Sequence, residues 1–175
     1  MERPTSKLFL LSDKWQIDSI RDEADTIDIR YGVYRQAQDP RGYVVFFNGR
    51  TEWIEKYDYL AEDLQLPPDV GFVTMDHRGQ GGSGGARSFV ESYDLFASDC
   101  RRVVETATSG KPYVLVGHSM GGLIALYGTM THQLNPRAMV LCSPLLGMPD
   151  DPVPRKFAKP VSRLLSTVRL GPLST

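Results

Sequence analysis

Short apolar segments alternate along this chain with segments whose apolar residues recur at helical spacing. We expect buried strands at four of the apolar segments, which cover residues 43–47, 71–75, 113–116 and 138–142. Another strand is expected from Ile27 to Tyr34, because apolar and polar side chains alternate there. Residues 1–26 are polar and mixed, and they carry little periodic signal.

Three segments with apolar residues at helical spacing separate the later strands, and the last of them is apolar nearly all round. Helices are expected from Trp53 to Leu64, from Phe96 to Ala107 and from Leu123 to Leu134. The first is closed by Pro67-Pro68 and the second by Gly110. Strands and helices that alternate in this way predict an α/β fold, doubly wound, with a mostly parallel sheet covered by helices on both faces.

Composition narrows the class of protein. The 175 residues suit a single domain, and 41% hydrophobic with 23% charged residues is typical of a globular chain. Lys and Arg number 20 and Asp and Glu 21, so the net charge of −1 does not favour nucleic acid as a partner. Cys100 and Cys142 are too few for a disulfide framework, and Leu8 to Leu11 is too short an apolar run for a signal peptide or a membrane span. We therefore expect a cytoplasmic protein.

The turn between the strand at 113–116 and the next helix carries a nucleophile motif. Gly117-His118-Ser119-Met120-Gly121 has the form G-x-S-x-G, which holds a serine on a sharp turn with its hydroxyl exposed above the sheet. Gly117 and Gly121 have a steric reason to lack side chains, since residues two positions from the serine crowd each other. The Met120 N–H, at the start of the new helix, points toward the place where an oxyanion would form.

A second oxyanion donor is expected after the strand at 43–47. Asn48-Gly49-Arg50 follows that strand, and Gly49 would let the chain turn so that the Arg50 N–H faces the serine. The alternative is an ordinary Asn-Gly turn.

Three motifs in this order resemble those of a known family. They are Phe47-Asn48-Gly49-Arg50-Thr51-Glu52-Trp53, Asp76-His77-Arg78-Gly79-Gln80-Gly81-Gly82-Ser83-Gly84 and Gly117-His118-Ser119-Met120-Gly121-Gly122. The chain resembles the N-terminal part of an α/β-hydrolase of the monoacylglycerol lipase and bacterial lysophospholipase group, over residues 43 to about 145. The bacterial branch fits best, because Gly-Arg stands where the lipases tend to have His-Gly-Ala.

This resemblance implies a serine hydrolase that cleaves carboxylic esters of single-chain lipids through an acyl-enzyme. It implies Ser119 as the nucleophile, Arg50 and Met120 as oxyanion donors through their backbone N–H groups, and no cofactor or metal. It also implies a lid after the strand at 138–142. We therefore expect residues 1–150 to belong to the hydrolase core and residues 151–175 to begin the lid.

The segment after Asp151 is basic and has apolar residues at helical spacing, interrupted by Pro160. We expect the first lid helix here, and a helix of this kind can also lie peripherally on a membrane surface, which is compatible with a lid.

Other functions fit parts of the same sequence. Gly79 to Gly84 also has the form G-x-G-x-x-G of a dinucleotide-binding turn, but Asp76-His77-Arg78 separates it from the strand and no helix opens within it. We expect the glycines instead to let this loop pass close to the site, held by hydrogen bonds from Asp76 and Arg78. A peptidase, a thioesterase or a non-catalytic binding module on the same scaffold are the remaining alternatives.

The general base is the missing component. In this fold the triad runs Ser, then Asp or Glu, then His along the chain, and the only histidine after Ser119 is His132, about 20 Å along the following helix. His118 must point away from the serine hydroxyl, and His77 would lie about 9–10 Å away if one strand intervenes. Asp150 and Asp151 are candidate acids. We expect the N-terminal portion of a longer hydrolase, truncated before its last strands, with the triad acid and histidine beyond Thr175 and little activity of its own.

Overall fold

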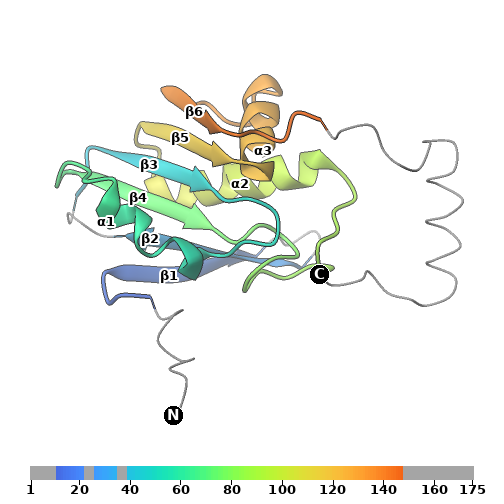
Figure 1. Ribbon diagram of the computed structural model, residues 1–175, viewed down its shortest axis with the longest axis horizontal. Coiled ribbons are helices and arrows are strands. Elements are labelled where there is room, and N and C mark those ends of the chain that lie inside the picture. Colours follow the sequence, from blue (N-terminus) through green and yellow to red (C-terminus); the bar gives the residue numbers. More distant parts are fainter. Residues whose placement is uncertain (1–10, 22–25, 35–38, 148–175) are drawn as a thin grey trace, which may run out of the picture.

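The computed structural model describes residues 11–21, 26–34 and 39–147, through which one six-stranded sheet runs (Figure 1). The strands are β1 (Trp15–Arg21), β2 (Asp28–Tyr34), β3 (Gly42–Phe47), β4 (Val70–Met75), β5 (Tyr113–His118) and β6 (Ala138–Cys142). The helices are the 3-10 turn η1 (Ile54–Tyr57) and the α-helices α1 (Leu60–Asp63), α2 (Tyr93–Thr108) and α3 (Met120–Met130). All five strands expected from the sequence are present.

The strand order is β1-β2-β4-β3-β5-β6. Strands β4, β3, β5 and β6 pair in parallel, whereas β1 with β2 and β2 with β4 pair antiparallel. The mostly parallel, doubly wound sheet is therefore confirmed, and its antiparallel pairings are confined to one edge. All four parallel strands have their carboxyl ends on the same side of the molecule, where the loops after β3, β4 and β5 lie (Figure 1).

Strand β1 was not expected from the sequence. It pairs with β2 along its whole length, from Trp15 opposite Tyr34 to Arg21 opposite Asp28. Only Trp15 is buried, and most of the other side chains of the strand are exposed. An edge strand that is held by backbone hydrogen bonds needs no apolar face, so the hydrophobic pattern carried little sign of it.

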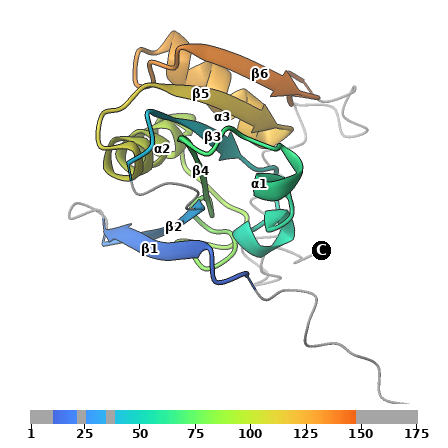
Figure 2. The same cartoon turned by 90° about the vertical axis from the view of Figure 1, so that its left-hand side faces the viewer.

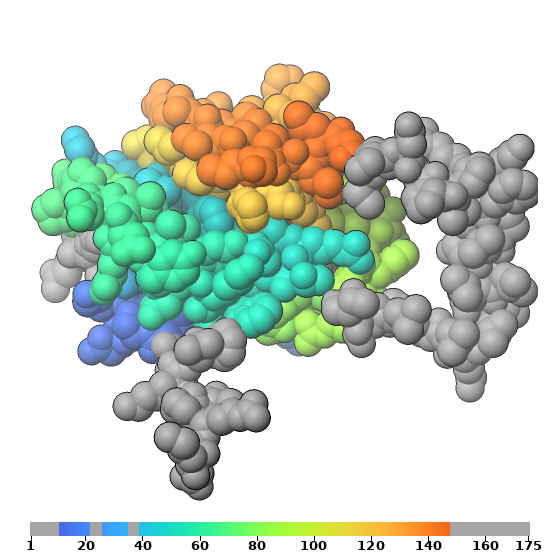
Figure 3. Space-filling view, viewed as in Figure 1, coloured from blue at the N-terminus to red at the C-terminus, as the bar shows by residue number. Residues whose placement is uncertain are grey.

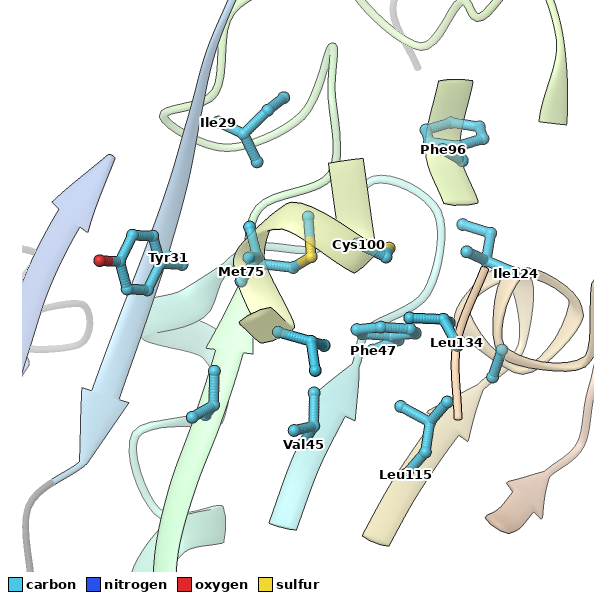
Figure 4. Close-up of a cluster of buried hydrophobic side chains, with 14 of the residues drawn as sticks. Ile29, Tyr31, Val45, Phe47, Met75, Phe96, Cys100, Leu115, Ile124 and Leu134 are labelled. Carbon is cyan, nitrogen blue, oxygen red and sulfur yellow. The ribbon is translucent and has the colours of Figure 1, made fainter. Parts of the chain in front are cut away.

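Two hydrophobic clusters lie on opposite faces of the sheet. Phe47 belongs to the larger cluster, which strands β2 to β5 form with α2 and α3 (Figure 4). Its neighbour Phe46 points the other way, into the smaller cluster beneath η1 and α1. Figure 2 shows α1 and α2 on opposite sides of the sheet. Because both faces are covered, β3 is apolar at every position from Tyr43 to Phe47.

The helix expected from Trp53 to Leu64 is wrong, because this segment forms η1 and α1 separately. Ile54, Tyr57 and Ala61 are buried on one face of it, so the apolar spacing is kept although the backbone is interrupted. The interruption falls at Asp58, whose carboxylate accepts a hydrogen bond of 2.6 Å from the Trp15 indole N–H. This contact ties the segment to β1.

Helix α3 is also shorter than expected. It ends at Met130, and the N–H groups of Gln133 and Leu134 both donate to the Gly128 carbonyl, at 2.8 and 2.9 Å. The chain folds back there, so that Leu134 reaches the larger cluster from outside the helix. Helix α2 ends at Thr108, and the next two residues, Ser109 and Gly110, both have positive φ, in agreement with the stop expected at Gly110.

Strand β6 forms one edge of the sheet among the described residues. Val140 is 49% exposed, and Figure 3 shows this edge open at the surface of the molecule. No helix in the described ranges is long and apolar enough to cross a membrane. Residues 151–175, the expected start of the lid, lie outside the described residues, as do Asp150 and Asp151.

A buried ion pair ties the loop after β4 to α2. The Arg78 guanidinium donates two hydrogen bonds to the Asp99 carboxylate, at 2.5 and 2.8 Å, and Arg102 donates a third at 2.9 Å. Arg78 and Asp99 are 6% and 1% exposed. The expectation that Arg78 helps to hold this loop is thereby confirmed.

Replacing the acid should therefore destabilise the fold. Asp99→Ala leaves two cations without their shared partner, and we expect the free energy of unfolding in urea to fall by about 3–5 kcal/mol. Glu105→Ala, which removes the exposed pair with Arg101 on the same helix, should cost below about 1 kcal/mol. Equal losses from the two variants would contradict the prediction.

Candidate active site

Ser119 lies on the turn between β5 and α3 in a conformation that residues with a side chain rarely adopt. Its φ is 52° and its ψ is −117°. The Ser119 N–H donates to the Cys142 carbonyl at 3.1 Å, and its own carbonyl accepts from the N–H groups of Gly122 and Leu145 at 3.1 and 2.9 Å. The end of β6 and the loop after it therefore hold the serine in this conformation.

Two glycines flank the serine because no side chain fits. A Cβ on Gly117 would lie 2.6 Å from the Gly122 Cα, and one on Gly121 would lie 2.1 Å from the Phe47 carbonyl oxygen. The expected crowding is thus present at both positions. At Gly121, however, the crowding neighbour is the end of β3 and not the far side of the turn.

The loop after β3 meets α3 at this point. Because a Cβ on Gly121 would meet the Phe47 and Asn48 carbonyls, the first turn of α3 lies beside the start of this loop, at residues 47 and 48. The Met120 N–H belongs to the first residue of α3, a position that has no acceptor inside the helix. The Arg50 N–H likewise has no acceptor among the residues that the structure describes.

Sequence reasoning missed the residues that hold this loop. Oε2 of Glu52 accepts hydrogen bonds of 2.6 Å from both the Gly49 N–H and the Tyr57 hydroxyl. The Thr51 N–H donates to the Gln80 side-chain oxygen. The acid three residues after Gly49 resembles half of a capping box and was a usable signal for Glu52. No local pattern points to Gln80, which lies 29 residues from its partner.

Asp76 anchors the loop after β4, as expected. Its buried carboxylate accepts hydrogen bonds from the N–H groups of Gly82 and Ile54, at 2.7 and 2.8 Å, and from Arg30 at 2.9 Å. Burial raises the pKa of Asp76 above its usual range, and these three donors act against that rise. A Cβ on Gly81, whose φ is +48°, would lie 2.3 Å from this carboxylate.

The glycine run in this loop does not open a helix. Helix α2 begins only at Tyr93, well after Gly84. A dinucleotide turn needs the helix N-terminus next to its glycines, so the arrangement fits a loop packed on Asp76 and not a dinucleotide site.

Among the described residues, none of the contacts recorded for the three histidines involves the Ser119 hydroxyl. Nδ1 of His118 lies 3.3 Å from the Cys142 carbonyl oxygen. His77 is buried, with its ring 5.8 Å from those of both Phe47 and Phe96. His132 lies beyond the end of α3, and not on it as expected, in a hollow that residues at the start of β5 also line. Ser119 follows the opposite end of β5.

The first prediction from the site concerns Gly121. Gly121→Ala would place a methyl group against the Phe47 backbone, which cannot move aside without disturbing β3. We expect at least about 1–3 kcal/mol of lost stability in urea unfolding. Gly147→Ala is the matched control, because a Cβ there would meet nothing within 4 Å. Wild-type stability in Gly121→Ala would contradict the close approach.

A second prediction concerns pH. Burial lowers the pKa of His77 from 6.5 to about 4, so below pH 6.5 the unfolded chain binds a proton that the folded chain does not. The contribution of neutral His77 to the free energy of unfolding is therefore fully present above pH 6.5, and it is lost as the pH falls toward 4. Between pH 7 and pH 5 the loss should be about 2 kcal/mol.

The comparison with His77→Phe isolates this contribution, since phenylalanine suits the aromatic surroundings and cannot titrate. Urea unfolding of both proteins at pH 7 and pH 5 measures it. The variant should lose less stability on acidification than the wild type, and equal losses would show that His77 is not the group responsible.

Comparison with known proteins places this geometry in a family. The family model of the serine aminopeptidase S33 hydrolases matches residues 38–172. The monoacylglycerol lipase of Mycolicibacterium smegmatis is 32% identical over 143 residues, which cover 79% of this chain and 51% of the lipase. The probable lysophospholipase L2 of Haemophilus influenzae is 30% identical over 126 residues, which cover 66% of this chain and 40% of that protein.

A solved structure shares the fold. The monoacylglycerol lipase of Paleococcus ferrophilus superposes with a TM-score of 0.61 at 25% identity, over 81% of this chain and 52% of the lipase. The chain spans about half the length of the curated relatives it matches. The family model covers well over half of the chain, which therefore belongs to the serine aminopeptidase S33 family and has the α/β-hydrolase fold.

Proposed function

We propose that this chain carries the nucleophile and the oxyanion hole of a serine hydrolase that cleaves esters of single-chain lipids. The observation that supports this most directly is the strained Ser119, with the first N–H of α3 beside it. Relatives named as monoacylglycerol lipase and lysophospholipase support a substrate with one acyl chain and a glycerol or glycerophosphate alcohol.

The proposed reaction passes through an acyl-enzyme. The Ser119 oxygen attacks the ester carbonyl carbon, and the carbonyl oxygen becomes an oxyanion. The C–O bond to the alcohol then breaks, the alcohol leaves with the proton that the serine hydroxyl gave up, and the acyl group stays on Ser119. Water attacks the same carbon in the second half, which releases the fatty acid and restores the serine hydroxyl.

The N–H groups of Met120 and Arg50 are the proposed donors to the oxyanion. Met120 is at the positive end of the α3 dipole, which adds to the attraction for a negative charge. Each donor of this kind stabilises the transition state by about 2.7–4 kcal/mol in comparable enzymes. Backbone donors need no reorganisation during the reaction if their loops are already fixed.

No histidine of this chain is assigned as the general base. His118 contacts the Cys142 carbonyl, His77 packs between phenylalanine rings, and His132 lies near the start of β5. The proposal therefore gives this chain the nucleophile and the oxyanion donors, and gives the base to none of its described residues.

A fluorophosphonate probe tests the nucleophile. The probe should label one serine of the chain, more slowly than in an enzyme with a complete triad because no described residue is assigned as the base, and Ser119→Ala should lose the labelling as read by intact mass and peptide mapping. Ser143→Ala, which replaces the exposed serine just after β6, should be labelled like the wild type. A folded chain that is not labelled would favour a non-catalytic binding module.

The choice between ester and peptide substrates needs a separate test, because the family description names a peptidase and the relatives are lipases. Release of fatty acid from a monoacylglycerol or a lysophospholipid, with no cleavage of aminoacyl amides, supports the proposal. The reverse pattern would replace it with a peptidase.

A further inference from the structure

The loop after β3 contains three successive amides, those of Gly49, Arg50 and Thr51, and the outer two donate hydrogen bonds to side chains. The Gly49 N–H donates to Oε2 of Glu52 at 2.6 Å, and the Thr51 N–H donates to the Gln80 side-chain oxygen. The middle amide, that of Arg50, has no acceptor among the described residues. The two acceptors thus fix the peptide planes on either side of the one amide that stays available.

Glu52 is itself firmly placed. Its side chain is 12% exposed, and the Lys56 ammonium binds its other carboxylate oxygen. Burial alone would raise the pKa of this carboxyl, but the donors Lys56, Tyr57 and the Gly49 N–H lower it below its usual range, so the acceptor stays ionised at neutral pH. The Tyr57 ring packs edge-on against Phe46, with centroids 4.6 Å apart. Tyr57 therefore connects the Glu52 carboxylate to the smaller hydrophobic cluster.

Gln80 belongs to the loop after β4, and backbone hydrogen bonds hold it there. Gln80 is 5% exposed. Its backbone N–H donates to the His77 backbone carbonyl at 2.9 Å, and its backbone carbonyl accepts from the Ser83 N–H at 3.0 Å. Its partner Thr51 has a φ of +60°, a conformation that needs support in a residue with a branched side chain. The bond to Gln80 supplies such support from the loop that Asp76 anchors.

The loop also lies against the nucleophile turn. A Cβ on Gly49 would lie 2.7 Å from Oε2 of Glu52 and 3.4 Å from the His118 ring, and His118 immediately precedes Ser119. A shift of Gly49 away from Glu52 would therefore move the Arg50 amide relative to the serine.

From these contacts we infer that Glu52 and Gln80 are positioning residues, which aim the Arg50 N–H at the oxyanion by holding the amides of Gly49 and Thr51. This inference rests on the proposed function, because it assumes that the Arg50 amide serves Ser119. Neither side chain touches the substrate. Their loss should slow the chemical step and leave the binding of the probe nearly unchanged.

The rate of fluorophosphonate labelling at Ser119, resolved into kinact and KI, tests this role. Glu52→Ala should lower kinact by about tenfold or more, with KI within about twofold of the wild type. Glu52→Gln keeps an oxygen acceptor and should recover much of that loss. Glu55→Ala is the matched control: this acid lies three residues further on, in η1, is 19% exposed and paired with Arg30, but does not contact residues 49–51.

A kinact in folded Glu52→Ala that equals the wild-type value would overturn the inference, as would an equal fall in Glu55→Ala. A kinact in Glu52→Gln as low as in Glu52→Ala would also overturn it. Thermal unfolding of each variant shows whether it is folded at the assay temperature. Gln80→Ala, which removes the acceptor for the Thr51 N–H, and Gln80→Glu, which keeps one, test the role of Gln80 in the same way.

Amide hydrogen exchange by NMR separates this inference from the proposed function. If wild-type Ser119 is not labelled, the proposed function fails, and exchange still reports on the loop. The Gly49 and Thr51 amides should exchange more slowly than that of Arg50. Glu52→Ala should speed the exchange at Gly49 by about tenfold or more and spare Thr51. Unchanged exchange at Gly49 would overturn the role of Glu52.

Discussion

The candidate site depends on one close approach, that of Gly121 to the carbonyls at the end of β3. Strands β3 and β5 are parallel neighbours, with Phe47 opposite Gly117, so they end at the same edge of the sheet. The turn after β5 is sharp enough to bring the first turn of α3 back against the carboxyl end of β3. Only a residue without Cβ permits this, since the added atom would lie 2.1 Å from the Phe47 oxygen. The approach places the start of α3 and the loop after β3 side by side, and both proposed oxyanion donors come from these two segments.

Buried carboxylates then hold the neighbouring loops in place. Asp76 joins β2, η1 and its own loop through Arg30, Ile54 and Gly82, and Asp99 ties the same loop to α2 through Arg78. A buried acid is costly unless donors surround it, and these acids have several each. The arrangement makes the loops mutually dependent. The loop after β4 carries Gln80, which contacts the loop after β3, so the anchors in one loop set the geometry of the other.

The sequence predicted the features that depend on local pattern. The apolar segments at 43–47 and 71–75 are strands because both faces of the sheet are covered, and the G-x-S-x-G motif falls on the expected turn. Strand β1 was not predicted because it is an edge strand with mostly exposed side chains. The prediction of one helix from Trp53 to Leu64 was wrong because two short helical turns share one apolar face. Gln80 could not be found, because its role depends on a contact between loops that are distant in the chain.

The parts of the site that this chain supplies share a physical character. Ser119 is presented by backbone strain, and the two proposed donors are backbone amides, so each depends on the path of the chain and not on the reach of a side chain. A general base is different, because a histidine ring must be delivered to within hydrogen-bond distance of the serine oxygen. The loops after β3, β4 and β5 are held together by contacts within the described residues. The proposed oxyanion hole is built on these loops, so the positions of its two donors follow from these contacts and do not depend on a base.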